Sequence, residues 1–258
     1  MDTPREFLTG SRYSARDLIY MRSVSSRLST VMTELTRAVR PGISGIDLSV
    51  YAVHLLRQHG LESALLGHEG FPSALAVSPD SVAVHGVPDN RPLEEGSIVT
   101  LDLGVRRDGW HADAARTVGV GRVSSRQATL IQAAYACCRA GIQVVRDGCD
   151  ISEIGAAVRA EARRRHVHVF AVCGGHGVGR QLHEAPHYRY SEMPHGLRLR
   201  QGNIITIEPV VTDVPDELRL APDGFSMVTG TDGLTAQFEH TVYVDESGPI
   251  VLTGIDGN

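Results

Sequence analysis

Apolar side chains recur every three or four residues in four stretches of the chain, and this spacing predicts four amphipathic helices. The predicted helices cover residues 14–39, 44–60, 126–146 and 151–164. Pro41-Gly42 follows the first and Asp147-Gly148 the third, and both pairs are typical of helix ends. The helices therefore come in two pairs, each joined by a short turn.

Short runs rich in β-branched residues fill most of the remaining chain and predict strands. They cover residues 74–77, 81–84, 97–105, 167–172, 203–211 and 234–244. Segments 38–42 and 144–148 resemble each other at an offset of 106 residues. The likeness is weak and can arise by chance. If it is real, the chain consists of two halves of α-α-β character related by a pseudo-twofold axis.

Composition limits the kinds of protein that this chain can be. Of 258 residues, 42% are apolar and 21% charged, which provides a sizeable core and excludes disorder as the main state. The formal charge of −5 argues against nucleic acid as a partner. The polar N-terminus and the lack of a long apolar stretch predict a cytoplasmic protein that does not contact the membrane. The four cysteines show no spacing that suggests a disulfide framework or a zinc site.

Two aspartates flank a predicted β-hairpin. Asp108-Gly109 suits its turn because both residues tolerate positive φ. With these two residues as the loop, Asp102 faces Ala115, and Asp113 is a diagonal neighbour of Asp102; a turn shifted by one residue places the two aspartates directly opposite each other. In either register the carboxylates lie close together, unless both point into water. Close carboxylates repel each other, and a bound cation would relieve that repulsion.

Two glutamates and a histidine add further candidate metal ligands. Glu208 lies in the apolar segment 203–211, where a lone buried carboxylate must be paired, protonated or metal-bound. Glu239 lies in the predicted strand 234–244. His176 stands among four glycines, which allow the backbone to approach a site closely. Taken singly, each of these residues has an ordinary structural explanation, and so does His85 at the end of segment 81–84.

The motifs, taken in order, resemble the type I methionine aminopeptidases of peptidase family M24. The motifs that match are H-G-V-P at 85–88, the D-x10-D pair at 102 and 113, G-H-G-x-G-x3-H-E-x-P at 175–186, T-I-E-P at 206–209 and A-Q-F-E-H-T at 236–241. The resemblance covers nearly the whole chain from about Ser14. It implies the pita-bread fold, an α/β (α+β) architecture of two pseudo-symmetric halves with a central antiparallel sheet covered by helices.

The resemblance also implies functional residues. It predicts two divalent metal ions (Co, Mn, Fe or Zn) per chain, and four carboxylates would neutralise their four positive charges. It implies Glu208 as general base and acid, with His85 and His183 as catalytic histidines that hydrogen-bond the substrate and the oxyanion. The implied metal ligands are Asp102, Asp113, His176, Glu208 and Glu239, with Asp113 and Glu239 shared between the ions.

The pocket for the first residue of the substrate departs from the family pattern. Aligned on the motifs, it consists of Leu65, His68, Phe71, Ala76, Leu182 and Phe225. His68 replaces a tyrosine, Ala76 a cysteine, Leu182 a phenylalanine and Phe225 a tryptophan. Such changes can broaden or shift the preference for the first residue without changing the chemistry.

We therefore expect a metal-dependent aminopeptidase that removes the first residue, and initiator methionine in particular, from a peptide or a nascent-protein N-terminus. One alternative is a specialised aminopeptidase of shifted or relaxed preference. Another is a non-catalytic binding protein of the same fold, although all five ligand positions are intact. Xaa-Pro dipeptidases generally carry a further N-terminal domain, and only about 13 residues precede the first predicted helix. We expect one domain over residues 1–258, with a short extension at about 1–13, and a monomer.

Overall fold

The computed structural model describes residues 10–191, 196–231 and 233–254. It contains the four predicted helices: α1 Ala15–Ala38, α2 Gly45–Gln58, α3 Ser125–Gln143 and α4 Ile151–Arg164. Each begins with a capping box in which a side chain satisfies a free backbone N–H group. The capping residues are Ser14, Ser44, Ser124 and Asp150. These local signals explain why the helix starts can be predicted from the sequence.

Seventeen short strands and one 3₁₀ turn, η1 His68–Gly70, make up the rest of the described structure. The first nine strands are β1 Glu62–Ser63, β2 Ala76–Pro79, β3 Val82–Val84, β4 Ile98–Asp102, β5 Val105–Arg107, β6 Trp110–Ala112, β7 Ala115–Gly119, β8 His168–Val169 and β9 Gly174–Gly177. The others are β10 Glu184–Arg189, β11 Ile204–Ile207, β12 Val210–Thr212, β13 Leu218–Leu220, β14 Met227–Thr229, β15 Thr235–Gln237, β16 His240–Asp245 and β17 Gly248–Val251.

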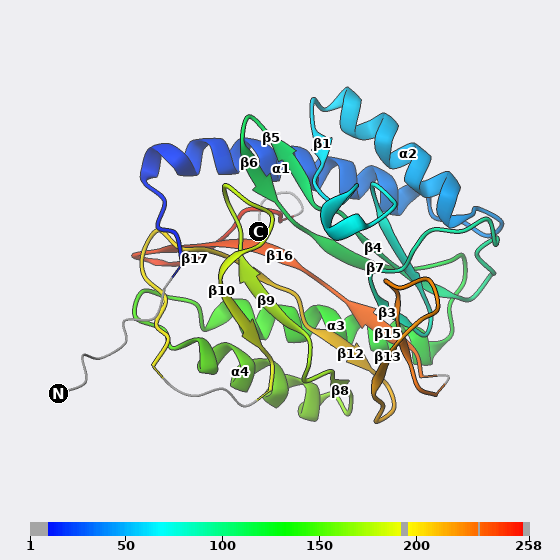
Figure 1. Ribbon diagram of the computed structural model, residues 1–258. Helices are drawn as coiled ribbons and strands as arrows, with labels where there is room; N and C mark the ends of the chain where they lie inside the picture. The colour runs from blue at the N-terminus through cyan, green and yellow to red at the C-terminus, as the bar shows by residue number, and fades with distance from the viewer. Residues whose placement is uncertain (1–9, 192–195, 232, 255–258) are drawn as a thin grey trace.

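The strands form five small antiparallel sheets. Their orders are β1-β5-β6, β10-β9-β11-β16-β17, β15-β12-β8, β13-β14-β3 and β2-β4-β7. In Figure 1, α1 and α2 lie along the upper part of the molecule and α3 and α4 along the lower part, with strands between the two pairs. One apolar core, which includes Leu28 and Leu101, packs under the first helix pair, and another, which includes Leu130 and Ile205, packs under the second.

The hairpin register agrees with the first of the two predicted alternatives. Asp102 pairs with Ala115 across β4 and β7, and Val105 pairs with Ala112 across β5 and β6. Asp108 and Gly109 both have positive φ, at 50° and 75°. The Asp-Gly turn therefore sets the register that brings the two aspartates together.

Three of the predicted continuous strands are interrupted, and the interruptions matter for the site. Segment 97–105 divides into β4 and β5, segment 203–211 into β11 and β12, and segment 234–244 into β15 and β16. In each case the chain leaves one small sheet and enters another. Glu239 lies in such a break, where its N–H donates to the carbonyl of Ala115 at 2.9 Å.

The four cysteines are free thiols, as their spacing in the sequence suggests. Cys137, Cys138 and Cys149 are buried as free thiols, and Cys173 is partly buried. None of the described helices is both long enough and apolar enough to cross a membrane.

Candidate metal centre

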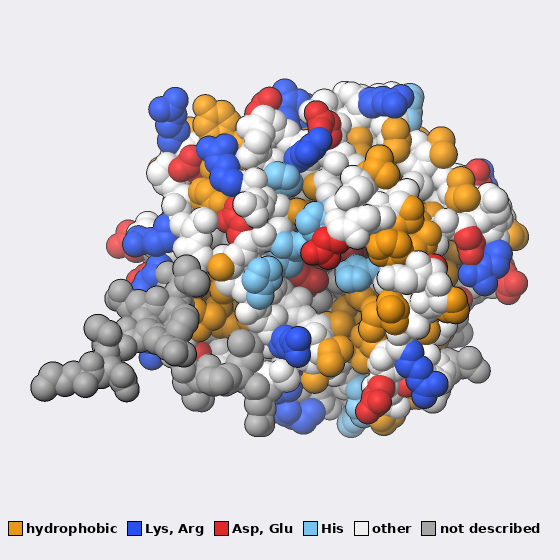
Figure 2. Space-filling model, in the orientation of Figure 1, with side chains coloured by type: hydrophobic (Ala, Val, Ile, Leu, Met, Phe, Trp, Pro, Cys, Tyr) orange, Lys and Arg blue, Asp and Glu red, His pale blue; other side chains and the backbone are white. Residues whose placement is uncertain are grey.

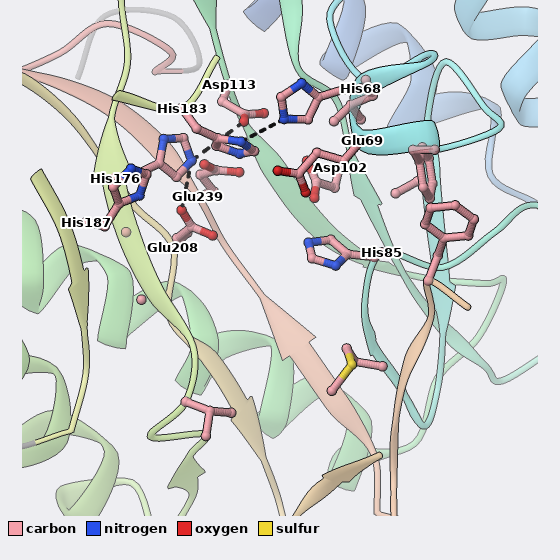
Figure 3. A pocket seen from close by; sticks show the side chains of 18 of the residues that line it. His68, Glu69, His85, Asp102, Asp113, His176, His183, His187, Glu208 and Glu239 are labelled. Atoms are coloured by element: carbon pink, nitrogen blue, oxygen red, sulfur yellow. Dashed lines mark hydrogen bonds and ion pairs between the residues drawn. The ribbon is translucent and has the colours of Figure 1, made fainter. Parts of the chain in front are cut away.

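A cavity of about 830 Å³ opens among the strands and gathers the predicted ligands. Figure 2 shows a hollow on this face of the molecule, with histidine and acidic side chains around it. Figure 3 shows how the labelled acidic and histidine side chains point toward one another within it. Asp102, Asp113, His176, Glu208 and Glu239 all line this cavity.

The four carboxylates share one structural feature: each stands where the chain passes from one sheet to another. Asp102 ends β4, and Asp113 lies between β6 and β7. Glu208 lies between β11 and β12, and Glu239 between β15 and β16. The breaks between sheets thus place four acidic side chains in one small volume.

Backbone hydrogen bonds hold Asp113 in place, whereas one carboxylate oxygen of Glu239 has no partner among the described residues. The N–H of Asp113 donates to the hydroxyl of Thr241 at 3.1 Å, and that hydroxyl donates to the carbonyl of Asp113 at 2.8 Å. Asp113 is 4% exposed and Glu239 2% exposed. Oε1 of Glu239 is buried without a hydrogen-bond partner in the described part of the chain. A buried carboxylate oxygen without a partner is costly, so it indicates a missing cation.

His176 has one ring nitrogen fixed and the other directed at the acidic cluster. Its Nδ1 lies 3.0 Å from the carbonyl oxygen of Gly177. Because a carbonyl oxygen only accepts hydrogen bonds, Nδ1 carries the proton and Nε2 has a free lone pair. Nε2 lies 3.3 Å from Oε1 of Glu208 and 4.0 Å from Oδ2 of Asp113. This arrangement of the imidazole is the one that metal ligation requires.

The ligand atoms fall into groups that share members. Two groups, each with its ligand atoms within 4.8 Å of one another, together contain the five predicted ligands and overlap at Glu239. One group is His176, Glu208 and Glu239; the other is Asp102, Asp113 and Glu239. A third group joins Asp113 and His176 to His183.

Burial of so much negative charge shifts the pKa values of the acids upward. Desolvation raises the pKa of Asp102 from 3.8 to about 7 and that of Glu208 from 4.5 to about 8. Desolvation and mutual repulsion raise the pKa values of Asp113 and Glu239 well above their ordinary values. Divalent cations would remove this cost, and an oxygen-rich ligand set with one imidazole suits them. The residues therefore fit a metal centre.

Two further predicted histidines line the same cavity. His85 has a positive φ of 55°, and desolvation lowers its pKa. The ring of His183 meets that of His176 edge-on at 4.4 Å. Desolvation, with a smaller contribution from His68, lowers the pKa of His183 to about 4. Both histidines are therefore neutral near pH 7.

The structure brings together five of the six residues predicted for the first-residue pocket. Leu65, His68, Phe71, Ala76 and Phe225 line the main cavity. The rings of Phe71 and Phe225 meet edge-on with centroids 5.6 Å apart. Together these residues form the apolar side of the cavity.

Leu182, the sixth residue predicted for the first-residue pocket, does not line the main cavity. It lines a neighbouring cavity instead. Gly104 allows this placement, because Cδ1 of Leu182 lies 2.8 Å from where a Cβ at position 104 would stand. The side chain thus packs on backbone between the two cavities.

Three charged or titratable residues of the cavity were not predicted from the sequence. Glu69, His187 and Arg189 also line it. His187 pairs with His176 across β9 and β10, although β10 was not expected as a strand. The only available signal was the run His183-Glu184-Ala185-Pro186-His187, which places a second histidine four residues after the first.

The chain resembles known proteins over most of its length. Residues 20–246 match the model of metallopeptidase family M24. Methionine aminopeptidase B of Synechocystis sp. is 36% identical over 249 residues, with 93% of this chain and 90% of that protein covered.

Solved structures of other proteins share the fold of this chain. The crystal structure of methionine aminopeptidase from Rickettsia prowazekii matches with a TM-score of 0.92 and 31% identity, covering 95% of this chain and all of that one. A prolidase from Pyrococcus furiosus matches with a TM-score of 0.74 and 18% identity, over 66% of its own length. The second likeness shows the shared fold alone.

Proposed function

The chain belongs to metallopeptidase family M24 and has its pita-bread fold, and we propose that it is a metal-dependent aminopeptidase that removes N-terminal methionine from peptides and nascent proteins. The observation that carries the proposal is the convergence of five ligand side chains, in two groups that overlap at Glu239, at one end of a cavity with an apolar side. Relatives named methionine aminopeptidase support it.

In this proposal the two groups hold two divalent ions, Co, Mn, Fe or Zn. Asp102, Asp113 and Glu239 would hold one ion, and His176, Glu208 and Glu239 the other, with Asp113 near enough to bridge. Bound divalent ions would polarise the scissile carbonyl and lower the pKa of water. The charge of four carboxylates balances that of two such ions.

Glu208 is the proposed general base and acid. Thr206 donates a hydrogen bond to Oε1 of Glu208 at 2.7 Å, and the N–H of Glu208 donates to the hydroxyl of Tyr190 at 2.7 Å. These contacts fix the carboxyl group so that it can take a proton from water and return it to the leaving amine. The pKa of about 8 in the metal-free protein shows how strongly this group holds a proton without neighbouring cations.

His85 and His183 are the proposed hydrogen-bond donors to the substrate. Neutral imidazoles donate one N–H each, which would stabilise the oxyanion that develops on the scissile carbonyl. The first side chain of the substrate would lie against Phe71, Ala76 and Phe225 on the apolar side of the cavity.

A relaxed or shifted preference for the first residue is the second candidate, and the pocket favours it. Leu182 does not line the main cavity, and His68 directs Nε2 toward Nδ1 of His183 at 2.9 Å. Both positions differ from the family pattern, so the walls around the first side chain are not those of a typical methionine pocket.

A peptide panel tests the proposal. Metal-free protein is reconstituted with Mn, Co, Fe or Zn and assayed on peptides that begin with Met, norleucine, Leu, Ala or Pro. We expect rapid release of methionine with at least one ion and no release by Glu208→Gln. Faster release of another first residue would establish the relaxed alternative. No turnover with any ion would contradict the enzymatic activity and favour a non-catalytic binding protein.

Whether it is an enzyme or a binding protein, we propose that the chain is a monomer in the cytoplasm.

A further inference from the structure

A second cavity of about 410 Å³ adjoins the metal centre. His68 and His183 line both cavities, so the two spaces share a wall made of the paired imidazoles. The remaining lining comes from residues 63, 64, 66 and 67, from the β5–β6 hairpin and from residues 180–182. The volume lies within the range of small-ligand sites.

The second cavity has the opposite charge to the first. Arg106 and Arg180 line it, and none of its lining residues in the described chain is a carboxylate. By contrast, five carboxylates line the main cavity. A ligand that extends from one cavity into the other therefore meets an acidic environment and then a basic one.

The ion pairs that both arginines form are weak. Arg106 pairs with Glu62 at 2.8 Å, but these side chains are 56% and 70% exposed. Arg180 lies 3.9 Å from Asp17 on the surface. Ion pairs near the surface contribute little to stability, so they do not prevent either guanidinium from pairing with a carboxylate that enters the cavity.

Arg180 is nevertheless well positioned. Its guanidinium carbon lies 3.7 Å from the centroid of the Trp110 ring. The N–H groups of Arg180 and Gln181 donate to Oε1 of Glu184 at 2.6 and 2.8 Å. The cavity thus presents the Arg180 guanidinium, held against the Trp110 ring, to an anionic ligand.

We propose that this cavity binds the part of the substrate that follows the scissile bond, and that it selects substrates with a carboxylate there. The inference rests on the proposed function. A chain whose first residue fills the main cavity and whose scissile bond faces His183 continues past the shared wall toward Arg106 and Arg180. The carboxylate is an acidic side chain at the second or third position, or the free C-terminus of a short peptide.

Hydrolysis of matched peptides tests the selection. We expect kcat/KM for Met-Ala-Asp-Ser amide to exceed that for Met-Ala-Lys-Ser amide by about fivefold, and Arg106→Gln to reduce the ratio below about twofold. Arg107→Gln is the matched control, because neighbouring strand residues face opposite sides and Arg107 does not line the cavity. Met-Ala-Ser as free acid and as amide separates a terminal carboxylate from a side chain. The same ratio of kcat/KM between the aspartate and lysine peptides in Arg106→Gln and Arg107→Gln would overturn the proposal.

A binding measurement keeps this test separate from the proposed function. Trp110 is the only tryptophan in the chain and touches Arg180, so its fluorescence reports on the second cavity. N-acetylated Ala-Asp-Ser amide lacks the free amine that the main cavity is proposed to take. We expect this peptide to change the fluorescence saturably and to bind about fivefold more tightly than the corresponding peptide with lysine in place of aspartate. We expect Arg180→Gln to abolish the fluorescence change. Methionine release without this response would overturn the second cavity alone, whereas the response without hydrolysis would overturn the proposed function.

Discussion

The two neighbouring cavities show how the same fold handles charge in opposite ways. The main cavity buries carboxylates that have too few partners, and their pKa values rise as a result. The neighbouring cavity presents two arginines, each paired with an acid that does not line the cavity. Buried, uncompensated charge is costly and requires a bound counter-ion, whereas exposed charge can exchange partners freely. The first cavity is therefore suited to hold metal permanently, and the second to bind and release a ligand.

The largest expected effect comes from removing a shared ligand in the main cavity. Glu239→Gln should lower kcat/KM by about 10³-fold, because Glu239 belongs to both ligand groups. Steady-state kinetics on a methionine-started peptide measures this. Glu94→Gln changes an exposed carboxylate that lines neither cavity, and it should change kcat/KM by less than about twofold. Comparable losses in both variants would show that the acidic cluster has no special role.

The next effect is on stability, and it depends on metal and pH. Because the folded-state pKa values of Asp102 and Glu208 are raised to about 7 and about 8, the folded metal-free protein binds more protons than the unfolded chain. This contribution to stability is fully present below about pH 4 and is lost as the pH rises toward 8. The free energy of unfolding of metal-free protein should fall by about 3 kcal/mol or more over that range.

Urea denaturation at a series of pH values checks this loss of stability. Saturating Mn²⁺ should restore most of it at pH 8, because the cations compensate the carboxylates. A metal-free protein whose stability rises between pH 5 and 8 would contradict the account of the buried acids.

Substitution of His183, in the wall between the two cavities, should have an intermediate effect on kcat/KM. His183→Ala should lower kcat/KM by about 10²-fold, because one proposed donor to the oxyanion is lost. Calorimetric titration should show Mn²⁺ affinity within about threefold of the unaltered protein, since all five predicted ligands remain. A large loss of metal affinity would make His183 a metal ligand instead, as its group with Asp113 and His176 allows.

The smallest effect separates the apolar side of the main cavity from its neighbour. Phe225→Ala should change the ratio of methionine to leucine release by about tenfold, because Phe225 lines the main cavity. Leu182→Val should change that ratio by less than about twofold, because Leu182 lines the second cavity. Competition assays with mixed peptides measure both. An equal shift in the two variants would place Leu182 in the first-residue pocket after all.

Most of the acidic residues of the main cavity could be predicted from the sequence because the signals that identify them are local. The Asp108-Gly109 turn determined the register that joins Asp102 and Asp113. Capping residues fixed the helix starts, and an acid within an apolar run, Glu208, stood out against its neighbours. Each signal needs only a few consecutive residues to be recognised.

The second cavity could not be predicted because its parts lie far apart. The His68–His183 contact joins residues 115 positions apart, and no periodicity or motif links them. The stacking of Arg180 on Trp110 likewise depends on where the loop between β9 and β10 meets strand β6. The departure of Leu182 from the pocket depends on the absence of a side chain at Gly104, which only the folded geometry shows.

Calorimetric titration of metal-free protein with Mn²⁺ tests the central claim most directly, namely that five side chains from separate sheets hold divalent cations together. We expect two ions per chain, and we expect Glu239→Gln to weaken binding of both because its carboxylate belongs to both ligand groups. Absence of binding, or binding that Glu239→Gln leaves unchanged, would contradict the account.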